Sequence, residues 1–280
     1  MRPFYNISGF LLSIVLWLWG VSFAGAAEES PAIAAASDLK FALETIAKQF
    51  SEDTGRNVKL SFGSSGNFFR QISQGAPFEV FLSADEQYVF ELEKQGLTEE
   101  PSQLYGLGRL VFFVPDGAPL VADAELKNLV DALNKGQIIH FAIANPEHAP
   151  YGRAAKEVLI AKGLWGSLQN KLVLGENVAQ AAQFAVSGSA EGGIFAYSLA
   201  LSPALRDKGH YVLLPDTLHS PLRQRMALLK NAGETAKAFY RYLQQERTRA
   251  VLSQYGFILP DHEGRETAPD FPVFNKPGPD

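Results

Sequence analysis

The chain has 280 residues, with 25 basic and 30 acidic side chains, a net charge of −5 and no cysteine. A mildly acidic chain without a run of basic residues is not expected to bind nucleic acid, because binding to phosphates depends on clustered Lys and Arg. A chain of this length can bury a sufficient core without disulfide bonds, so the lack of cysteine is compatible with an exported protein.

The first 26 residues have the pattern of a secretory signal peptide. After Arg2 this stretch carries no charge, and its apolar centre at residues 10–19 is too short to cross a bilayer comfortably. Ala24, Gly25 and Ala26 form a small-x-small cleavage pattern, so cleavage is expected before Ala27. An uncleaved N-terminal anchor is the alternative. The expected location of the mature protein is the bacterial periplasm.

Short apolar strands then alternate with amphipathic helices. Strands are expected at residues 33–36, 58–62 and 80–82. Each is followed by residues whose apolar positions recur with helical spacing, with stops at Gly55 and Gly75 and an N-cap at Asp85. Repeated β-α units predict a mostly parallel sheet with helices on both faces.

A second series of the same kind follows. Its strands are expected at residues 110–114, 138–143, 172–174 and 193–195, and its helices at 124–133, 154–160 and 178–186. The chain then returns with a strand at 223–229 and helices at 235–243 and 247–255. Crossings near residues 108–112 and 212–218 would join two α/β lobes around a cleft, and ligands bind in such clefts outside the carboxyl ends of the strands.

These crossings suggest where the lobes divide. Lobe 1 is expected to comprise residues 27–109 and 217–260, and lobe 2 residues 110–216. Residues 261–280 contain four prolines without any periodicity, which is typical of a flexible tail. A strap packed over the surface by Phe271 and Phe274 is the alternative.

Small uncharged residues recur where an apolar strand passes into a helix. The clearest cases are residues 34–38 (AAASD) and 62–67 (FGSSGN). The first N–H groups of a helix have no partner within it and lie at the positive end of the helix dipole, so such a junction suits an anion. Several junctions that converge on one point would surround an oxyanion with neutral donors.

Six segments between residues 32 and 257 together form a recognisable set. They are 34–39 (AAASDL), 62–66 (FGSSG), 75–85 (GAPFEVFLSAD), 145–152 (NPEHAPYG), 175–178 (GENV) and 255–257 (YGF). In this order they resemble the periplasmic molybdate-binding proteins of ABC transporters. The resemblance implies a two-lobed α/β binding protein of type II, each lobe a mostly parallel sheet flanked by helices. Such a protein closes on a tetrahedral dianion and delivers it to a membrane permease.

The resemblance also implies which groups contact the ligand. From the first lobe these are the hydroxyl and N–H of Ser37, with the N–H of Asp38, and the same two groups of Ser65. From the second lobe they are the N–H groups of Tyr151 and Val178. The carboxylate of Asp38 is expected to turn away from the ligand and cap its own helix, because an uncompensated charge facing an anion is unfavourable.

The sequence departs from the family pattern at a fifth contact. Many family members place a tyrosine hydroxyl at the position that aligns with Ala196, whereas this chain has its tyrosine one residue later, at Tyr197. Adjacent residues of a strand face opposite sides, so Tyr197 need not reach the ligand. Either Tyr197 or the phenol of Tyr151 could supply the contact.

A cage of donors without acceptors favours a fully deprotonated dianion. A protonated oxygen, as in hydrogen phosphate, would leave its own O–H unpaired, at a loss of roughly 1 to 3 kcal/mol. The expected ligands are molybdate and tungstate, and this preference follows from the resemblance alone. Sulfate has the same charge and shape, so a sulfate carrier of the same fold is the alternative, as is a sensor without a transport role. The protein is expected to be a monomer and to need no cofactor.

An enzyme is the remote alternative. Ser37 and Lys40 fit the S-x-x-K pattern and Ser65 with Asn67 fits S-x-N, two of three elements of penicillin-recognising acyl enzymes. The third, K-[ST]-G, is absent from the sequence. The five histidines lack metal-ligand spacing, so no metal site is expected.

Overall fold

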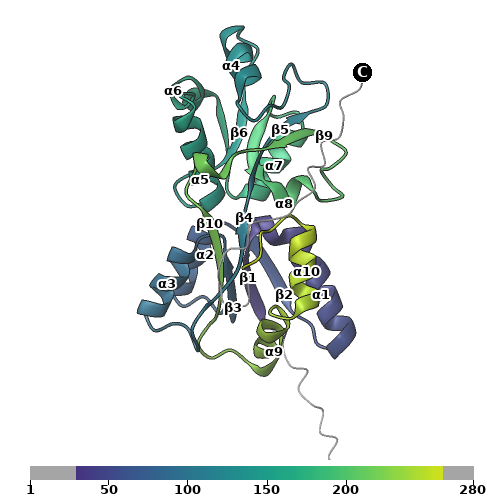
Figure 1. Ribbon diagram of the computed structural model, residues 1–280. Helices are drawn as coiled ribbons and strands as arrows, with labels where there is room; N and C mark the ends of the chain where they lie inside the picture. The colour runs from purple at the N-terminus through teal and green to yellow at the C-terminus, as the bar shows by residue number, and fades with distance from the viewer. Residues whose placement is uncertain (1–29, 261–280) are drawn as a thin grey trace, which may run out of the picture.

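A computed structural model describes residues 30–260, so the expected signal peptide (1–26) and tail (261–280) lie outside the described residues. Two five-stranded sheets, each flanked by helices, form two lobes that lie one above the other (Figure 1). The predicted α/β fold is therefore confirmed. Between residues 30 and 260, no helix combines the length and the apolar character that a membrane span requires.

The first lobe contains a sheet of order β2-β1-β3-β10-β4. Its strands are β1 (Ala32–Ala36), β2 (Lys59–Gly63), β3 (Val80–Ser83), β4 (Gln103–Gly108) and β10 (Leu222–Leu228). β1 pairs in parallel with β2 and β3, whereas β10 runs antiparallel to both β3 and β4. The helices of this lobe are α1 (Lys40–Thr54), preceded by the 3-10 turn η1 (Ser37–Leu39), α2 (Ser65–Ser73), α3 (Glu86–Lys94), α9 (Glu234–Tyr242) and α10 (Glu246–Gln254).

The second lobe repeats this arrangement in the order β7-β6-β8-β5-β9. Its strands are β5 (Leu110–Pro115), β6 (Phe141–Ala144), β7 (Leu172–Gly175), β8 (Gly193–Ala196) and β9 (Gly209–Leu213). β6 is parallel to β7 and β8, and β5 is antiparallel to β8 and β9. The helices and 3-10 turns are α4 (Lys127–Asn134), α5 (Pro150–Ala161), α6 (Trp165–Leu168), η2 (Gln169–Lys171), α7 (Val178–Val186), α8 (Tyr197–Ala200) and η3 (Asp216–Leu218).

Each sheet is mixed because one of its strands arrives directly from the other lobe. β4 passes into β5 through Arg109, and β9 returns to β10 through residues 214–221. In both sheets the arriving strand is the antiparallel one. The edge strands β4 and β9 were not predicted, whereas the parallel strands and the long helices were.

The ends of the helices follow local sequence signals. Asp85 caps α3 by accepting from the N–H of Gln87 at 2.9 Å, as predicted, and Asn177 caps α7 by accepting from the N–H of Gln180 at 3.1 Å. Helix α1 ends at Gly55, whose φ of +70° is a left-handed conformation that glycine adopts without strain. These caps set the points at which the helices begin and end relative to the strands.

The core of the first lobe lies on both faces of its sheet. Ile33 and Ala35 pack into one buried cluster together with Phe50 and Phe239, whereas Ala34 packs into a second cluster with Phe81. Successive side chains of a strand point to opposite faces, so a strand buried on both sides is apolar throughout. The continuous apolar runs in the sequence are explained by this double burial.

Phe50→Ala tests how strongly this core is packed. Phe50 is fully buried, and its ring lies edge-on to Phe239 and Tyr242 at centroid distances of 5.1 and 5.3 Å. The substitution is expected to lower the free energy of unfolding by about 3–5 kcal/mol, measured by urea unfolding. The control is Val121→Ala, at a residue that is 63% exposed, for which a change within about 0.5 kcal/mol is expected. Equal effects of the two substitutions would contradict the packing described.

Candidate functional site

Four helix starts converge on a small cavity between the lobes. η1 and α2 approach it from the first lobe, and α5 and α7 from the second. The cavity has an empty volume of about 180 Å³ and is lined by Ala36, Ser37, Asp38, Gly63, Ser64, Ser65, Ala84, Ala149, Pro150, Tyr151 and Val178. Over the part of the chain that the structure describes, no basic side chain lines this cavity.

The sheets explain why these helix starts meet. β1 and β2 are parallel neighbours in the first sheet, and η1 and α2 follow their carboxyl ends. β6 and β7 are parallel neighbours in the second sheet, and α5 and α7 follow theirs. Since the carboxyl ends of parallel neighbours share one sheet edge, each lobe presents two helix starts to the other.

Backbone N–H groups supply the first set of donors. Ser65, Tyr151 and Val178 each lie in the first turn of a helix, and the N–H of none of them has an acceptor within residues 30–260. The neighbouring groups are paired instead. The N–H of Gly66, for example, donates to the carbonyl of His148 at 3.0 Å. The three unpaired N–H groups therefore suit an anion at the positive ends of three helices.

Two serine hydroxyls supply the second set. Ser37 Oγ accepts from the N–H of Ala179 at 3.2 Å, and Ser65 Oγ accepts from the N–H of Ala84 at 2.9 Å. Both serines are almost completely buried. Because each oxygen already accepts a hydrogen bond, each hydroxyl is oriented to donate its proton to a further acceptor in the cavity.

Ser64 has a different role from its neighbour. Its Oγ caps α2 by accepting from the N–H of Asn67 at 3.4 Å and lies 2.9 Å from Nδ1 of His148 in the second lobe. Ser64 thus connects the two lobes at the rim of the cavity.

Several other contacts join the lobes around the cavity. Ser198 Oγ donates to the carbonyl of Asp38 at 2.8 Å, and Arg153 forms an ion pair with Asp85. At Gly66 an added Cβ would lie 2.6 Å from the carbonyl oxygen of His148, so only glycine allows this approach. The structure therefore has its lobes in contact.

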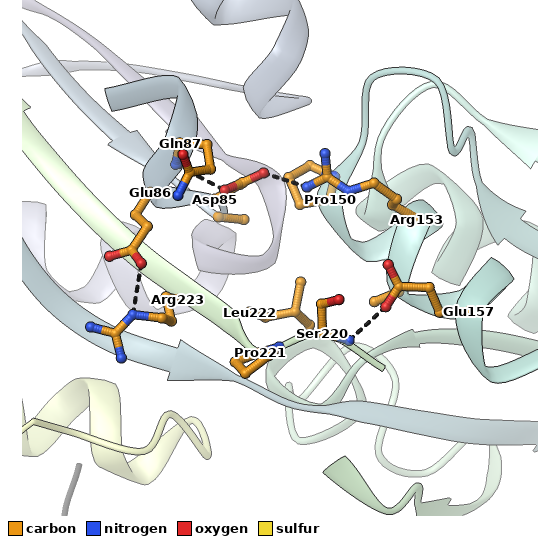
Figure 2. Close-up of a pocket in the computed structure, with 12 residues that line it drawn as sticks. Asp85, Glu86, Gln87, Pro150, Arg153, Glu157, Ser220, Pro221, Leu222 and Arg223 are labelled. Atoms are coloured by element: carbon orange, nitrogen blue, oxygen red, sulfur yellow. Dashed lines mark hydrogen bonds and ion pairs between the residues drawn. The ribbon is translucent and has the colours of Figure 1, made fainter. Parts of the chain in front are cut away.

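A larger pocket, with an empty volume of about 710 Å³, adjoins the cavity and shares Ala84 and Pro150 with it. Figure 2 shows charged side chains of both lobes around it, with Arg153 directed toward Asp85. Glu157 accepts from the N–H of Ser220 at 2.6 Å. The carboxylates along this pocket make it less suited to an anion than the donor-lined cavity.

Asp38 belongs to a buried hydrogen-bond network at the edge of the cavity. Its Oδ2 accepts from Nε2 of Gln224 at 2.6 Å, and its carboxyl is also hydrogen bonded to the phenol of Tyr151. Tyr105 donates to Oε1 of Gln224 at 2.6 Å. Burial raises the pKa of Asp38 to about 6, although the hydrogen bonds from Gln224 and Tyr151 lower it.

The carboxyl of Asp38 was expected to cap its own helix. Gln224 on β10 donates to this carboxyl, and the N–H groups of Asp38 and Leu39 at the start of the helix also lower its pKa through hydrogen bonds. The N-cap residues of η1 and α1 are Ala36 and Leu39, and neither forms a side-chain cap. The phenol of Tyr151 is also engaged, since it accepts from Gln224 at 3.0 Å and is hydrogen bonded to Asp38. The backbone N–H of Tyr151, and not its phenol, is therefore the group that remains free to donate to a ligand in the cavity.

Tyr197 does not reach the cavity, unlike the other five residues expected to contact the ligand. The strand ends at Ala196, and Tyr197 begins α8, where its N–H donates to the carbonyl of Arg109 at 2.8 Å. Its ring packs against Tyr211 at a centroid distance of 5.8 Å. The expected hydroxyl contact from Tyr197 has no support in this placement.

Three residues of the site were not predicted as parts of it. Gln224 lies in phase with Leu222 and Met226 at the buried positions of β10, and a polar residue at such a position was the signal available in the sequence. Tyr105 lies on β4, which was itself not predicted. His148, in the loop before α5, contacts Ser64 across the lobes. Among residues 30–260, no group of His, Asp and Glu side chains could hold a metal ion.

Comparison with known proteins shows which family this chain resembles. The family model described as "Bacterial extracellular solute-binding protein" matches residues 32–258. The chain is 37% identical to the molybdate-binding protein ModA of Rhodobacter capsulatus, over 85% of this chain and 92% of that protein. It is 38% identical to ModA of Azotobacter vinelandii, over 81% and 89% of the two chains.

Solved structures agree with these relatives. The periplasmic molybdate-binding protein of Azotobacter vinelandii matches with a TM-score of 0.75 and 31% identity, over 82% of this chain and all of that one (100%). The sulfate-binding protein SubI of Mycobacterium tuberculosis shares the fold, with a TM-score of 0.66 and 17% identity over 84% and 88% of the two chains. The chain belongs to the bacterial extracellular solute-binding proteins and, among them, to the family of the ModA molybdate-binding proteins.

Proposed function

We propose that this protein binds molybdate or tungstate in the cavity between its lobes and delivers it to an ABC permease. The observation that carries the proposal is the set of neutral donors around the cavity. Three unpaired helix-start N–H groups and the hydroxyls of Ser37 and Ser65 surround a space that no basic side chain lines within the described residues. The names of the relatives at 37% and 38% identity support molybdate as the ligand.

The donors select the charge state of the ligand. All of these groups donate, so an oxyanion without protons can pair each oxygen that faces them. Hydrogen phosphate would bring an O–H without an acceptor, which is unfavourable by about 1–3 kcal/mol. Sulfate can accept from the same donors but has a smaller volume, so it is the second candidate ligand. Discrimination between molybdate and sulfate then depends on the size of the closed cavity.

The division of donors between lobes supports closure on the ligand. Ser37 and Ser65 belong to the proposed first lobe (27–109 and 217–260), whereas Tyr151 and Val178 belong to the proposed second lobe (110–216). A ligand completes its shell of donors only when the lobes meet, so it shifts the population toward the closed form. We propose that the permease recognises this closed form of the exported monomer, after cleavage before Ala27.

The geometry gives no support to an acyl enzyme. Ser37 Oγ contacts the N–H of Ala179, whereas Nζ of Lys40 lies over the ring of Phe41 at 5.7 Å from its centroid. A nucleophilic serine needs a base within hydrogen-bond reach, and Lys40 does not occupy that place.

Ligand-linked stability tests the proposed function directly. Molybdate at about a hundred times its dissociation constant is expected to stabilise the protein by about 2.7 kcal/mol, because it binds the folded closed form. The measurement is a melting curve, with titration calorimetry of molybdate, tungstate, sulfate and phosphate to obtain the affinities. Sulfate and phosphate at equal concentration are expected to raise the melting temperature much less. Equal shifts with sulfate and molybdate would contradict selection by size.

Ser37→Ala and Ser65→Ala test the two hydroxyl donors. A hydrogen bond to a charged acceptor contributes about 1.5–3 kcal/mol, so each substitution is expected to weaken molybdate binding by roughly tenfold to a hundredfold. Titration calorimetry measures the change. Ser189→Ala serves as the control, because Ser189 is exposed and bonded to Ser187. If both cavity variants kept the affinity of the unaltered protein, the hydroxyls would not contact the ligand.

A further inference from the structure

One feature of the cavity does not fit a cage of neutral donors. Asp38 lines the cavity, is only 2% exposed, and forms no ion pair with any described cation. Its Oδ1 is buried without a hydrogen-bond partner, whereas Oδ2 accepts from Gln224. A carboxylate in this position would share a closed cavity with a dianion.

We propose that Asp38 carries a proton whenever the dianion is bound, so that the protein takes up one proton from solvent with each oxyanion it captures. This inference rests on the proposed function, because it requires an anion in the cavity. The proton binds to a carboxylate oxygen of Asp38, and the closed complex then contains two negative charges at the site instead of three.

Electrostatics favours the neutral acid. Like charges in a space that excludes water repel each other far more strongly than in solvent, which raises the pKa of the carboxyl. In the absence of any anion, burial already raises the pKa of Asp38 to about 6, against the lowering effect of its hydrogen bonds. The charge of the ligand acts in the same direction as burial.

The unpartnered oxygen of the carboxyl favours the neutral acid as well, against the hydrogen bonds from Gln224 and Tyr151, which lower its pKa. An ionised carboxylate is an acceptor at both oxygens, and the buried Oδ1 meets no donor here. A protonated carboxyl needs fewer donors and itself gains one, in a cavity whose other polar groups are donors. Protonation therefore removes the mismatch that the unpartnered oxygen represents.

None of the groups that face Asp38 competes with it for the proton. Tyr151 on α5 and Tyr105 on β4 are phenols whose pKa values burial raises well above their usual range, so both stay neutral. Gln224 on β10 and Ser198 on α8 do not titrate. On its own helix, the side chain of Lys40 is directed to Phe41.

His148 is the other titratable side chain at the rim of the cavity. Its Nδ1 lies 2.9 Å from Ser64 Oγ, and its Nε2 lies 3.5 Å from a carboxylate oxygen of Glu176. Proton uptake at this side chain would give the same calorimetric signal as uptake at Asp38. The experiment must therefore separate these two residues.

The pH dependence has a definite sign. Because the anion raises the pKa of Asp38, affinity is greatest below the pKa of the unliganded protein, about 6 in this conformation, and falls as the pH rises above it. The decrease is up to about tenfold per pH unit until the pKa of the complex is reached. Asp38→Asn, which imitates the neutral acid, is expected to bind with little dependence on pH and more tightly than the unaltered protein at pH 8.5.

Titration calorimetry with molybdate tests the inference. Measured at pH 7.5 in buffers of different ionisation enthalpy, the observed heat gives the number of protons taken up. We expect close to one proton per molybdate for the unaltered protein and close to none for Asp38→Asn. Asp53→Asn, in the helix α1 that follows η1, is the matched control, because Asp53 pairs with Tyr242 and Arg247 instead, and it should keep the uptake.

The possible results distinguish this inference from the proposed function. Molybdate binding without proton uptake would overturn the inference alone, whereas no molybdate binding at any pH would overturn both. Proton uptake that persists in Asp38→Asn and disappears in His148→Gln would assign the proton to His148. That result would also overturn the inference. If Asp38→Asn does not fold, uptake by the unaltered protein that persists in His148→Gln supports Asp38, and uptake lost in that variant contradicts it.

Discussion

An anion that meets no cation in its site is held by dipoles, and a dipole helps only when the fold fixes its direction. Here the direction follows from strand order. Two parallel neighbours in each lobe end at the same sheet edge, and each passes directly into a helix, so four helix starts face one cavity. In the proposed site, Tyr151 and Val178 contribute through their N–H groups, whatever their side chains are. The site depends on backbone geometry, and the parallel pairs β1-β2 and β6-β7 are its foundation.

The dipoles surround the cavity only because the two lobes approach very closely. At the rim, Gly66 lies against the backbone of His148, where a methyl group would not fit. Ser37 and Ser64 each meet a partner from the opposite lobe, so the same short segments that face the cavity also hold the lobes together. In the proposed function, binding and closure therefore depend on one set of residues.

Sequence patterns predicted the parts of the fold that local rules govern. Apolar strands buried on both faces, helix caps such as Asp85 and the strand-to-helix junctions at Ser37 and Ser65 follow from neighbouring residues alone. Contacts between distant segments did not follow. Gln224 donates to the carboxyl of Asp38 across 186 positions of the chain, and no local pattern indicated that bond. Tyr197 was misplaced because the end of β8 turns its ring toward Tyr211.

The two crossings of the chain set how the lobes can move. Two short connections, at Arg109 and at residues 214–221, act as a pair of pivots, so the easiest relative motion is a rotation about the line that joins them. At Gly108, beside the first pivot, an added Cβ would clash with the phenol of Tyr151 and with Gln224. The hydrogen bond between Asp38 of the first lobe and Tyr151 of the second thus lies next to the axis, where a large swing of the lobes changes distances little. As the lobes open, this contact between them is expected to break later than the contacts at the outer rim.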